Sequence, residues 1–160
     1  MTTRRTNLFE RIGNMIRGYK GYSLRDEKRN TDKKLRDELS GIIQQSEKTV
    51  ITHQQQLLKT GEMQLCQEWE IARKSLNTIF SKIKNATYGE SSFFSDQQLK
   101  ETGLDEIYKI DLEMSERVHL ILKTVDAEIN EKMSANFVNQ QVREIDSILI
   151  KRTNFINQFK

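Results

Sequence analysis

The sequence predicts an all-α protein, either a long antiparallel helical hairpin or a four-helix up-down bundle, with a short N-terminal amphipathic helix. The chain has no Pro and only 7 Gly in 160 residues, so most helix breakers are missing. Apolar residues recur at alternating steps of three and four, a heptad-like seam that is typical of coiled coils and needs a partner helix to cover it. No alternating run of Val, Ile and Thr bounded by turn residues indicates a strand.

Composition predicts one bundle domain over residues 22–160, preceded by a basic amphipathic helix at residues 1–21. No apolar run approaches the roughly 18 residues that would cross a membrane. Glu10, Arg11 and Asn14 interrupt the apolar residues of the N-terminus, which argues against a secretory signal. With Cys66 as the single cysteine, no intrachain disulfide can form, and a cytoplasmic protein is the simplest expectation.

The N-terminal helix is expected at residues 4–19, where Leu8, Ile12, Met15 and Tyr19 repeat on one side. Such a helix suits the surface of an anionic membrane, because its apolar side can insert while Arg and Lys meet the headgroups. Packing against the bundle, docking onto a partner protein and, less favoured, binding of nucleic acid remain open. The expected contact residues are Arg4, Arg5, Leu8, Phe9, Arg11, Ile12, Met15, Ile16, Arg17 and Lys20.

Charge is distributed unevenly along the chain. Residues 1–36 carry 11 Lys and Arg against 4 Asp and Glu, a net charge of +7. The remaining 124 residues carry 15 against 19, a net charge of −4. A basic head on an acidic body points to an anionic partner for the head, although the same cations could simply solvate a helix face.

From residue 24 onward the chain is expected to be helical with few breaks. Residues 25–34 are nearly all polar, so they should project beyond the bundle or lie under the N-terminal helix. Gly61 is the strongest interior break. The seam positions before and after it are Leu35, Leu39, Ile42, Ser46, Val50, His53 and Leu57, then Leu65, Trp69, Ala72, Leu76, Ile79, Ile83 and Ala86.

Residues 88–103 form the clearest connection, and at least one of Phe93 and Phe94 should plug the end of the bundle. Turns at Gly61 and near residues 134–136 would give four helices, whereas helices continuous through both places would give a hairpin about 90 Å long. The seam of the last stretch comprises Leu104, Ile107, Asp111, Met114, Val118, Ile121 and Val125, then Val138, Val142, Ile145, Leu149, Arg152, Ile156 and Phe159.

No motif in the sequence predicts catalysis, a cofactor or a metal. Glu116 and His119 have the Glu-x-x-His spacing of di-iron bundles, but no second copy accompanies them. Cys66 is expected to be a small core residue rather than a nucleophile, and no glycine lies in a phosphate-binding loop pattern. A non-enzymatic protein without a cofactor is therefore expected.

The stretch from Leu8 to Arg17, Leu-Phe-Glu-Arg-Ile-x-x-Met-Ile-Arg, resembles the opening helix of the phage-shock-protein-A family of bacterial membrane-stress proteins. That resemblance implies an all-helical protein with a long hairpin whose first helix binds anionic membranes. The chain lacks the Pro-containing segment that follows this helix in the family. Two further stretches are similar to uncharacterised bacterial helical proteins: Gly21, Tyr22, Arg25, Arg29, Asp32, Leu35 and Arg36, and Tyr88, Gly89, Phe93, Phe94, Leu104, Asp105, Ile107, Tyr108 and Asp111.

The expected function is thus a bacterial helical scaffold that associates peripherally with the inner face of the membrane through its basic N-terminus. The alternative is a protein-interaction module, or a subunit of a larger assembly, without membrane contact. An uncovered seam would also favour a homo-oligomer.

Overall fold

The computed structural model describes residues 3–88, 91–95, 99–127 and 132–159, which contain five α-helices and no strand. The predicted all-α bundle is therefore confirmed. The helices are α1 (Thr3–Met15), α2 (Arg25–Thr60), α3 (Met63–Lys84), α4 (Glu101–Ala127) and α5 (Lys132–Asn157).

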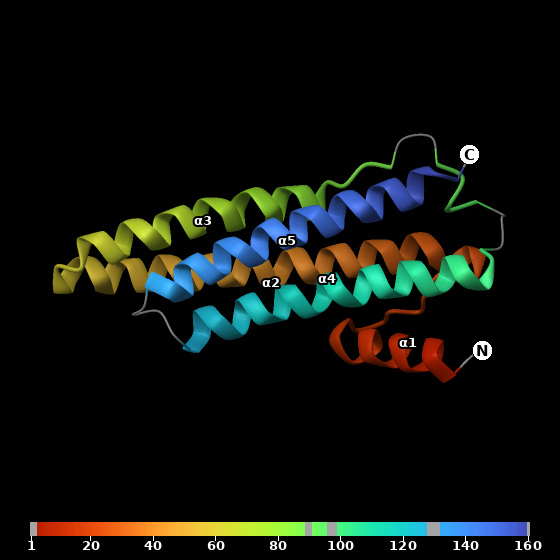
Figure 1. The fold of residues 1–160 in the computed structure, drawn as a ribbon, viewed down its shortest axis with the longest axis horizontal. Helices are drawn as coiled ribbons and strands as arrows, with labels where there is room; N and C mark the ends of the chain where they lie inside the picture. Colours follow the sequence, from red (N-terminus) through yellow and green to blue (C-terminus); the bar gives the residue numbers. More distant parts are fainter. Residues whose placement is uncertain (1–2, 89–90, 96–98, 128–131, 160) are drawn as a thin grey trace.

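Helices α2 to α5 form a closed four-helix bundle, and α1 lies outside it against α4 (Figure 1). Around the bundle, α2 neighbours α3 and α4, while α5 completes the ring between α3 and α4. The pairs α2–α3 and α4–α5 are antiparallel, whereas α2 runs parallel to α4 and α3 runs parallel to α5 (Figure 1). The chain therefore passes diagonally from the end of α3 to the start of α4.

The sequence left open whether the chain turns at Gly61 and near residues 134–136, and the structure has a turn at Gly61 and helix at residues 134–136. Gly61 ends α2 in the left-handed conformation (φ 81°), and its N–H bonds the carbonyls of the last turn. Residues 134–136, the second candidate turn, lie inside α5, because that helix already begins at Lys132. Ser134 and Ala135 are buried there, so small residues at this place serve close packing rather than a turn.

Most of the predicted seam positions are buried in the core, and Ile42, His53, Leu65, Ala86 and Phe159 are half-buried. Every seam position of α4 is buried, and so is every seam position of α5 up to Ile156. Trp69 is the largest of the fully buried side chains. Because four helices enclose these seams, they are covered within one chain, and the long open hairpin is excluded.

The polar start of α2 was expected to project beyond the bundle or to lie under the N-terminal helix, but part of it is buried in the bundle and α1 packs on α4 instead. Lys28, Thr31 and Asp32 are buried there. Burial is possible because the neighbouring segments supply partners: Lys28 Nζ donates to the carbonyl of Phe93 (3.0 Å), and Thr31 Oγ1 donates to the carbonyl of Gly21 (2.9 Å). A polar helix face is thus part of the interior at this end.

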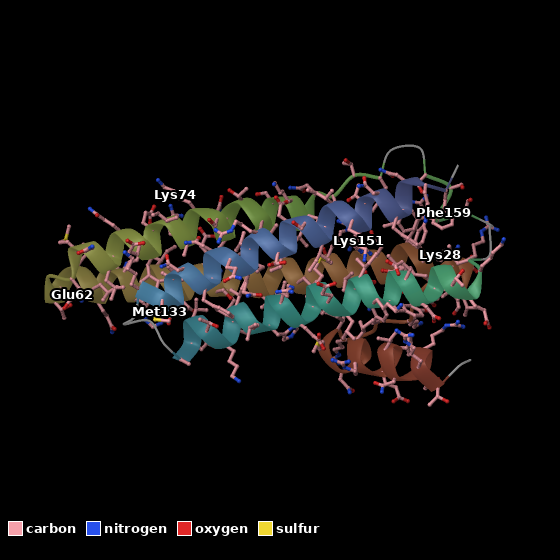
Figure 2. The ribbon with its side chains drawn as sticks, in the orientation of Figure 1. Lys28, Glu62, Lys74, Met133, Lys151 and Phe159 are labelled. Carbon is pink, nitrogen blue, oxygen red and sulfur yellow. The ribbon has the colours of Figure 1, made fainter. Side chains whose placement is uncertain are left out.

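The connection between α3 and α4 closes the same end. Phe93 and Phe94 are both buried, which confirms the expected plug. The Ser92 N–H donates to the carbonyl of Phe159 (3.0 Å), so the connection is fastened to the end of α5. Figure 2 shows Lys28 and Phe159 at this end of the bundle, with Glu62 and Met133 towards the other. A buried polar cluster centred on Arg152 lies within the end that carries Lys28.

Candidate functional site

The apolar side of α1 exists as predicted, and α4 covers it. Ile12 and Ile16 are fully buried, and Leu8, Phe9 and Met15 are partly buried against the core. Because this contact removes apolar surface from water, it stabilises the fold. The five apolar residues expected to insert into a membrane are therefore engaged within the protein.

The cations of the N-terminal helix divide into two groups. Arg5 is buried, and its Nε donates to Asp105 Oδ1 (2.7 Å), which lowers the pKa of that carboxyl. Arg11 pairs with Glu116 across the α1–α4 contact. Arg4, Arg17 and Lys20 are exposed, and Lys20 reaches Glu27 at 3.0 Å. Arg5 and Arg11 thus fasten α1 to the acidic side of α4, and the exposed group points outward.

An exposed basic surface follows α1 in the chain. We call Arg17, Lys20 and Arg25, together with the exposed Leu24 between them, the basic surface. Leu24 is 66% exposed, the second largest exposure among the large apolar side chains of the described residues. Exposed cations close in sequence to one exposed apolar side chain are a composition that suits contact with an anionic partner.

Behind this surface lies a buried polar cluster centred on Arg152 of α5, which is completely inaccessible to solvent. Its Nε donates to Asp111 Oδ1 of α4, and its Nη1 donates to Asp32 Oδ1 of α2, both at 2.8 Å. The same guanidinium donates to the hydroxyl oxygens of Tyr88 (2.7 Å) and Tyr22 (2.8 Å). One side chain therefore joins three helices and two connecting segments.

The two carboxylates of the cluster are satisfied by further donors. Asp111 Oδ2 accepts hydrogen bonds from the hydroxyls of Tyr19 (2.7 Å) and Tyr22 (2.6 Å). Asp32 Oδ1 accepts one from Tyr88 (2.6 Å).

Asp32 Oδ2 accepts a further bond from Arg36 Nε (3.0 Å), so Arg152 and Arg36 together balance the two carboxylate charges. A buried ionic cluster of this kind is tolerated because its charges cancel and its donors and acceptors are paired.

The cluster shifts the acidity of its members. Burial alone would raise the pKa of Asp32, but Arg152, Tyr88 and Arg36 outweigh burial and lower it. Burial raises the pKa of Tyr88 to about 12, against the opposing effect of Arg152. Burial also raises the pKa of Tyr19 and Tyr22 well above the usual value, and nearby Asp111 adds to the shift in both.

All four tyrosines of the chain are therefore expected to resist ionisation at pH 10. Tyr108, the fourth, also has its pKa raised by burial. A phenol whose pKa is higher in the folded state stabilises the fold below about pH 10, and that contribution is lost as the pH rises through the folded value. Absorbance at 295 nm should show less tyrosinate at pH 10 in the native protein than in guanidinium chloride, where about half of the full signal is expected. Half-ionisation of a tyrosine near pH 10 in the native protein would contradict the closed cluster.

Within the described residues, no group of three or more His, Cys, Asp and Glu side chains could hold a metal ion. Glu116, one half of the Glu-x-x-His pattern, pairs with Arg11, and His119 Nδ1 faces the Ser115 carbonyl at 2.8 Å.

None of the described helices is long and apolar enough to span a membrane.

The cluster escaped prediction although its signal is present in the sequence. Asp111 and Arg152 both occupy seam positions, where an apolar residue is the rule. Two opposite charges at core positions of different helices indicate a buried ion pair. Tyr19 and Tyr22 carry no such signal, because tyrosines beside glycines are also typical of exposed turns.

Comparison of this chain with protein families, with curated proteins and with solved structures finds no match.

Proposed function

We propose that this protein is a non-catalytic interaction module whose basic surface binds an acidic protein partner. The observation that supports the proposal is the division of residues 4–20: Ile12 and Ile16 are buried and Leu8, Phe9 and Met15 are partly buried against the core, while Arg4, Arg17 and Lys20 stay outside. Because the apolar side of this helix is already covered, its exposed cations are available to a partner, whereas its apolar side chains are not available to a membrane. Complementary charge gives specificity and fast association between folded proteins.

The basic surface is held on a rigid frame, which favours recognition of a defined partner. Tyr19 and Tyr22 lie within the same segment as Lys20, and both hydroxyls donate to the buried carboxylate of Asp111. Side chains that project from a fixed segment lose less conformational entropy on binding than those of a flexible tail. The geometry therefore suits a protein surface with matching carboxylates.

Binding to an anionic membrane is the second candidate, and the position of α1 favours it. Among the helices, α1 lies against α4 only, so it can leave without opening the four-helix bundle. Release would uncover Phe9, Ile12 and Ile16 together with the cations beside them. Each cation near an anionic bilayer adds about 1 kcal/mol of binding free energy.

One pair of variants tests both candidates. Arg17→Glu with Lys20→Glu should abolish partner capture from a cell extract, because the reversed charges repel an acidic surface. Lys48→Glu with Lys59→Glu changes the same number of exposed lysine or arginine charges farther along α2 and should leave capture unchanged. A partner retained equally by both variants would refute the proposal.

Sedimentation with neutral and anionic phospholipid vesicles distinguishes the protein partner from the membrane. The wild-type protein is expected to stay in the supernatant with both. If it sediments with anionic vesicles, and the Arg17→Glu, Lys20→Glu variant does not, the membrane becomes the partner and the protein-partner proposal fails.

A further inference from the structure

A second basic feature lies on another side of the same end of the bundle. A pocket of about 410 Å³ opens between the start of α2, the end of α3 and the segment that follows α3. Its volume falls in the range of about 300–1,000 Å³ that small-molecule sites occupy. The basic surface contributes none of its lining residues, so this pocket is a separate feature.

The lining carries a surplus of positive charge. Arg29, Lys33, Arg36 and Lys84 contribute four cations, against the carboxylates of Asp32 and Asp37. Asp32 is already bonded to Arg152 behind the pocket wall, and Asp37 lies 3.4 Å from Lys33 Nζ. Asp32 is also paired with Arg36 (3.0 Å), so the positive surplus of the lining rests on Arg29 and Lys84, and this surplus favours an anion.

Aromatic rings hold two of the cations in place. The Arg29 guanidinium lies 5.1 Å from the ring centre of Phe94, and that of Arg36 lies 5.9 Å from the ring centre of Tyr88. Arg36 is further fixed because its Nη1 donates to the Lys84 carbonyl at 2.7 Å. The Tyr88 hydroxyl is in turn bonded by Arg152. The buried cluster thus forms the rigid back wall of the pocket.

We infer that this pocket binds a phosphoryl group, either as free phosphate or as the phosphate of a small monoester. A phosphate monoester carries a charge of about −1.5 to −2 at neutral pH and has three strong acceptor oxygens. Several cations in one lining match that charge better than they match the single charge of a carboxylate. Arg29 is especially suited, since the planar fork of an arginine can bond two phosphate oxygens at once, whereas Arg36 already uses Nε and Nη1 for Asp32 and the Lys84 carbonyl.

The arrangement also places apolar surface beside the cations. Tyr88 and Phe94 line the pocket together with Ala86, and Tyr88 is only half-buried. A monoester can therefore place its organic group against this apolar part of the lining while its phosphate meets the cations. A free phosphate ion would use the cations alone.

The test is a titration of the full-length protein with inorganic phosphate, phenyl phosphate and phenol at constant ionic strength, followed by amide resonances in nuclear magnetic resonance. Both phosphates are expected to bind saturably, with shifts concentrated in residues 29–37 and 84–88. Phenol should not bind. Tighter binding of phenyl phosphate than of phosphate identifies a monoester as the ligand, and equal binding identifies the free ion.

Matched variants locate the site. Arg29→Ala with Lys33→Ala should weaken binding of both phosphates by at least about tenfold, because charge-assisted hydrogen bonds are lost. Both residues are exposed, so the fold should persist, and Lys84→Ala gives an independent check. Lys48→Ala with Lys59→Ala should change the affinity less than about twofold, since these cations lie outside the pocket.

Absence of saturable binding by both phosphates, or an equal loss in the control variant, would overturn the inference. Shifts spread over all exposed cations would do the same. These results would leave the proposed protein partner untouched, because that proposal depends on Arg17 and Lys20 and is read out by partner capture.

Discussion

Replacing Arg152 by methionine is expected to lower the free energy of unfolding by about 3–5 kcal/mol, the usual cost of breaking a buried ion pair from one side. The substitution leaves Asp32 and Asp111 inside the protein without their central cation. It also removes the bonds that Tyr22 and Tyr88 accept. Urea denaturation followed by circular dichroism measures the change.

The adjacent residue supplies the control for this experiment. Lys151 pairs with Glu106 on the surface at 3.1 Å, and its side chain is more than half exposed. Lys151→Met should therefore shift the free energy of unfolding by no more than about 0.5–1 kcal/mol. Similar effects of the two substitutions would show that the cluster contributes little.

The loss caused by Arg152→Met should also depend on pH. In the wild-type protein the lowered pKa of Asp32 adds stability above about pH 4, and this contribution disappears as the pH falls. In the variant, buried carboxylates without a cation gain stability by taking up protons. The difference between the two proteins should therefore shrink on acidification, whereas a simple packing defect would leave it constant.

Substituting Gly21 by alanine is expected to cost about 2–4 kcal/mol, because a left-handed backbone and a steric clash act together. Gly21 has a φ of 78°, and an added Cβ would lie 2.3 Å from the Tyr108 hydroxyl oxygen and 3.0 Å from the Phe9 ring. Tyr108 resists moving, since its hydroxyl accepts the Tyr22 N–H at 3.1 Å. The substitution should therefore loosen α1 and the segment after it.

Gly13 provides the matched comparison. It lies within α1, and an added Cβ would have no atom within 4 Å. Gly13→Ala should therefore stabilise the protein by about 0.5–1 kcal/mol, the cost of glycine in a helix interior. Thermal unfolding of both variants gives the comparison, and a neutral Gly21→Ala would refute the close contact of this turn with Tyr108.

The core was largely predictable from periodicity, because a helix that buries one side must repeat its apolar residues at that spacing. The turn at Gly61 was also predictable, since glycine reaches the left-handed conformation without strain. The region near Asn136 was left open between a turn and a continuous helix, because small residues fit both a turn and tight packing; it lies inside α5.

The position of α1 depends on information that its own sequence does not contain. The helix expected over residues 4–19 ends at Met15, and an amphipathic helix of this kind has the same pattern whether it covers a membrane or another helix. Its partner is specified on α4, where Asp105 and Glu116 match Arg5 and Arg11. These pairs join residues about a hundred positions apart, which a reading of local spacing does not connect.

The cluster around Arg152 also has a consequence for folding kinetics. The hairpins α2–α3 and α4–α5 bring together residues close in sequence, and such contacts form quickly. The bond from Arg152 to Asp32 spans 120 residues, so it requires both hairpins to be in place. Interactions that form late contribute little to the rate of folding and slow the rate of unfolding. We therefore expect the cluster to lower the unfolding rate and to prolong the lifetime of the assembled bundle.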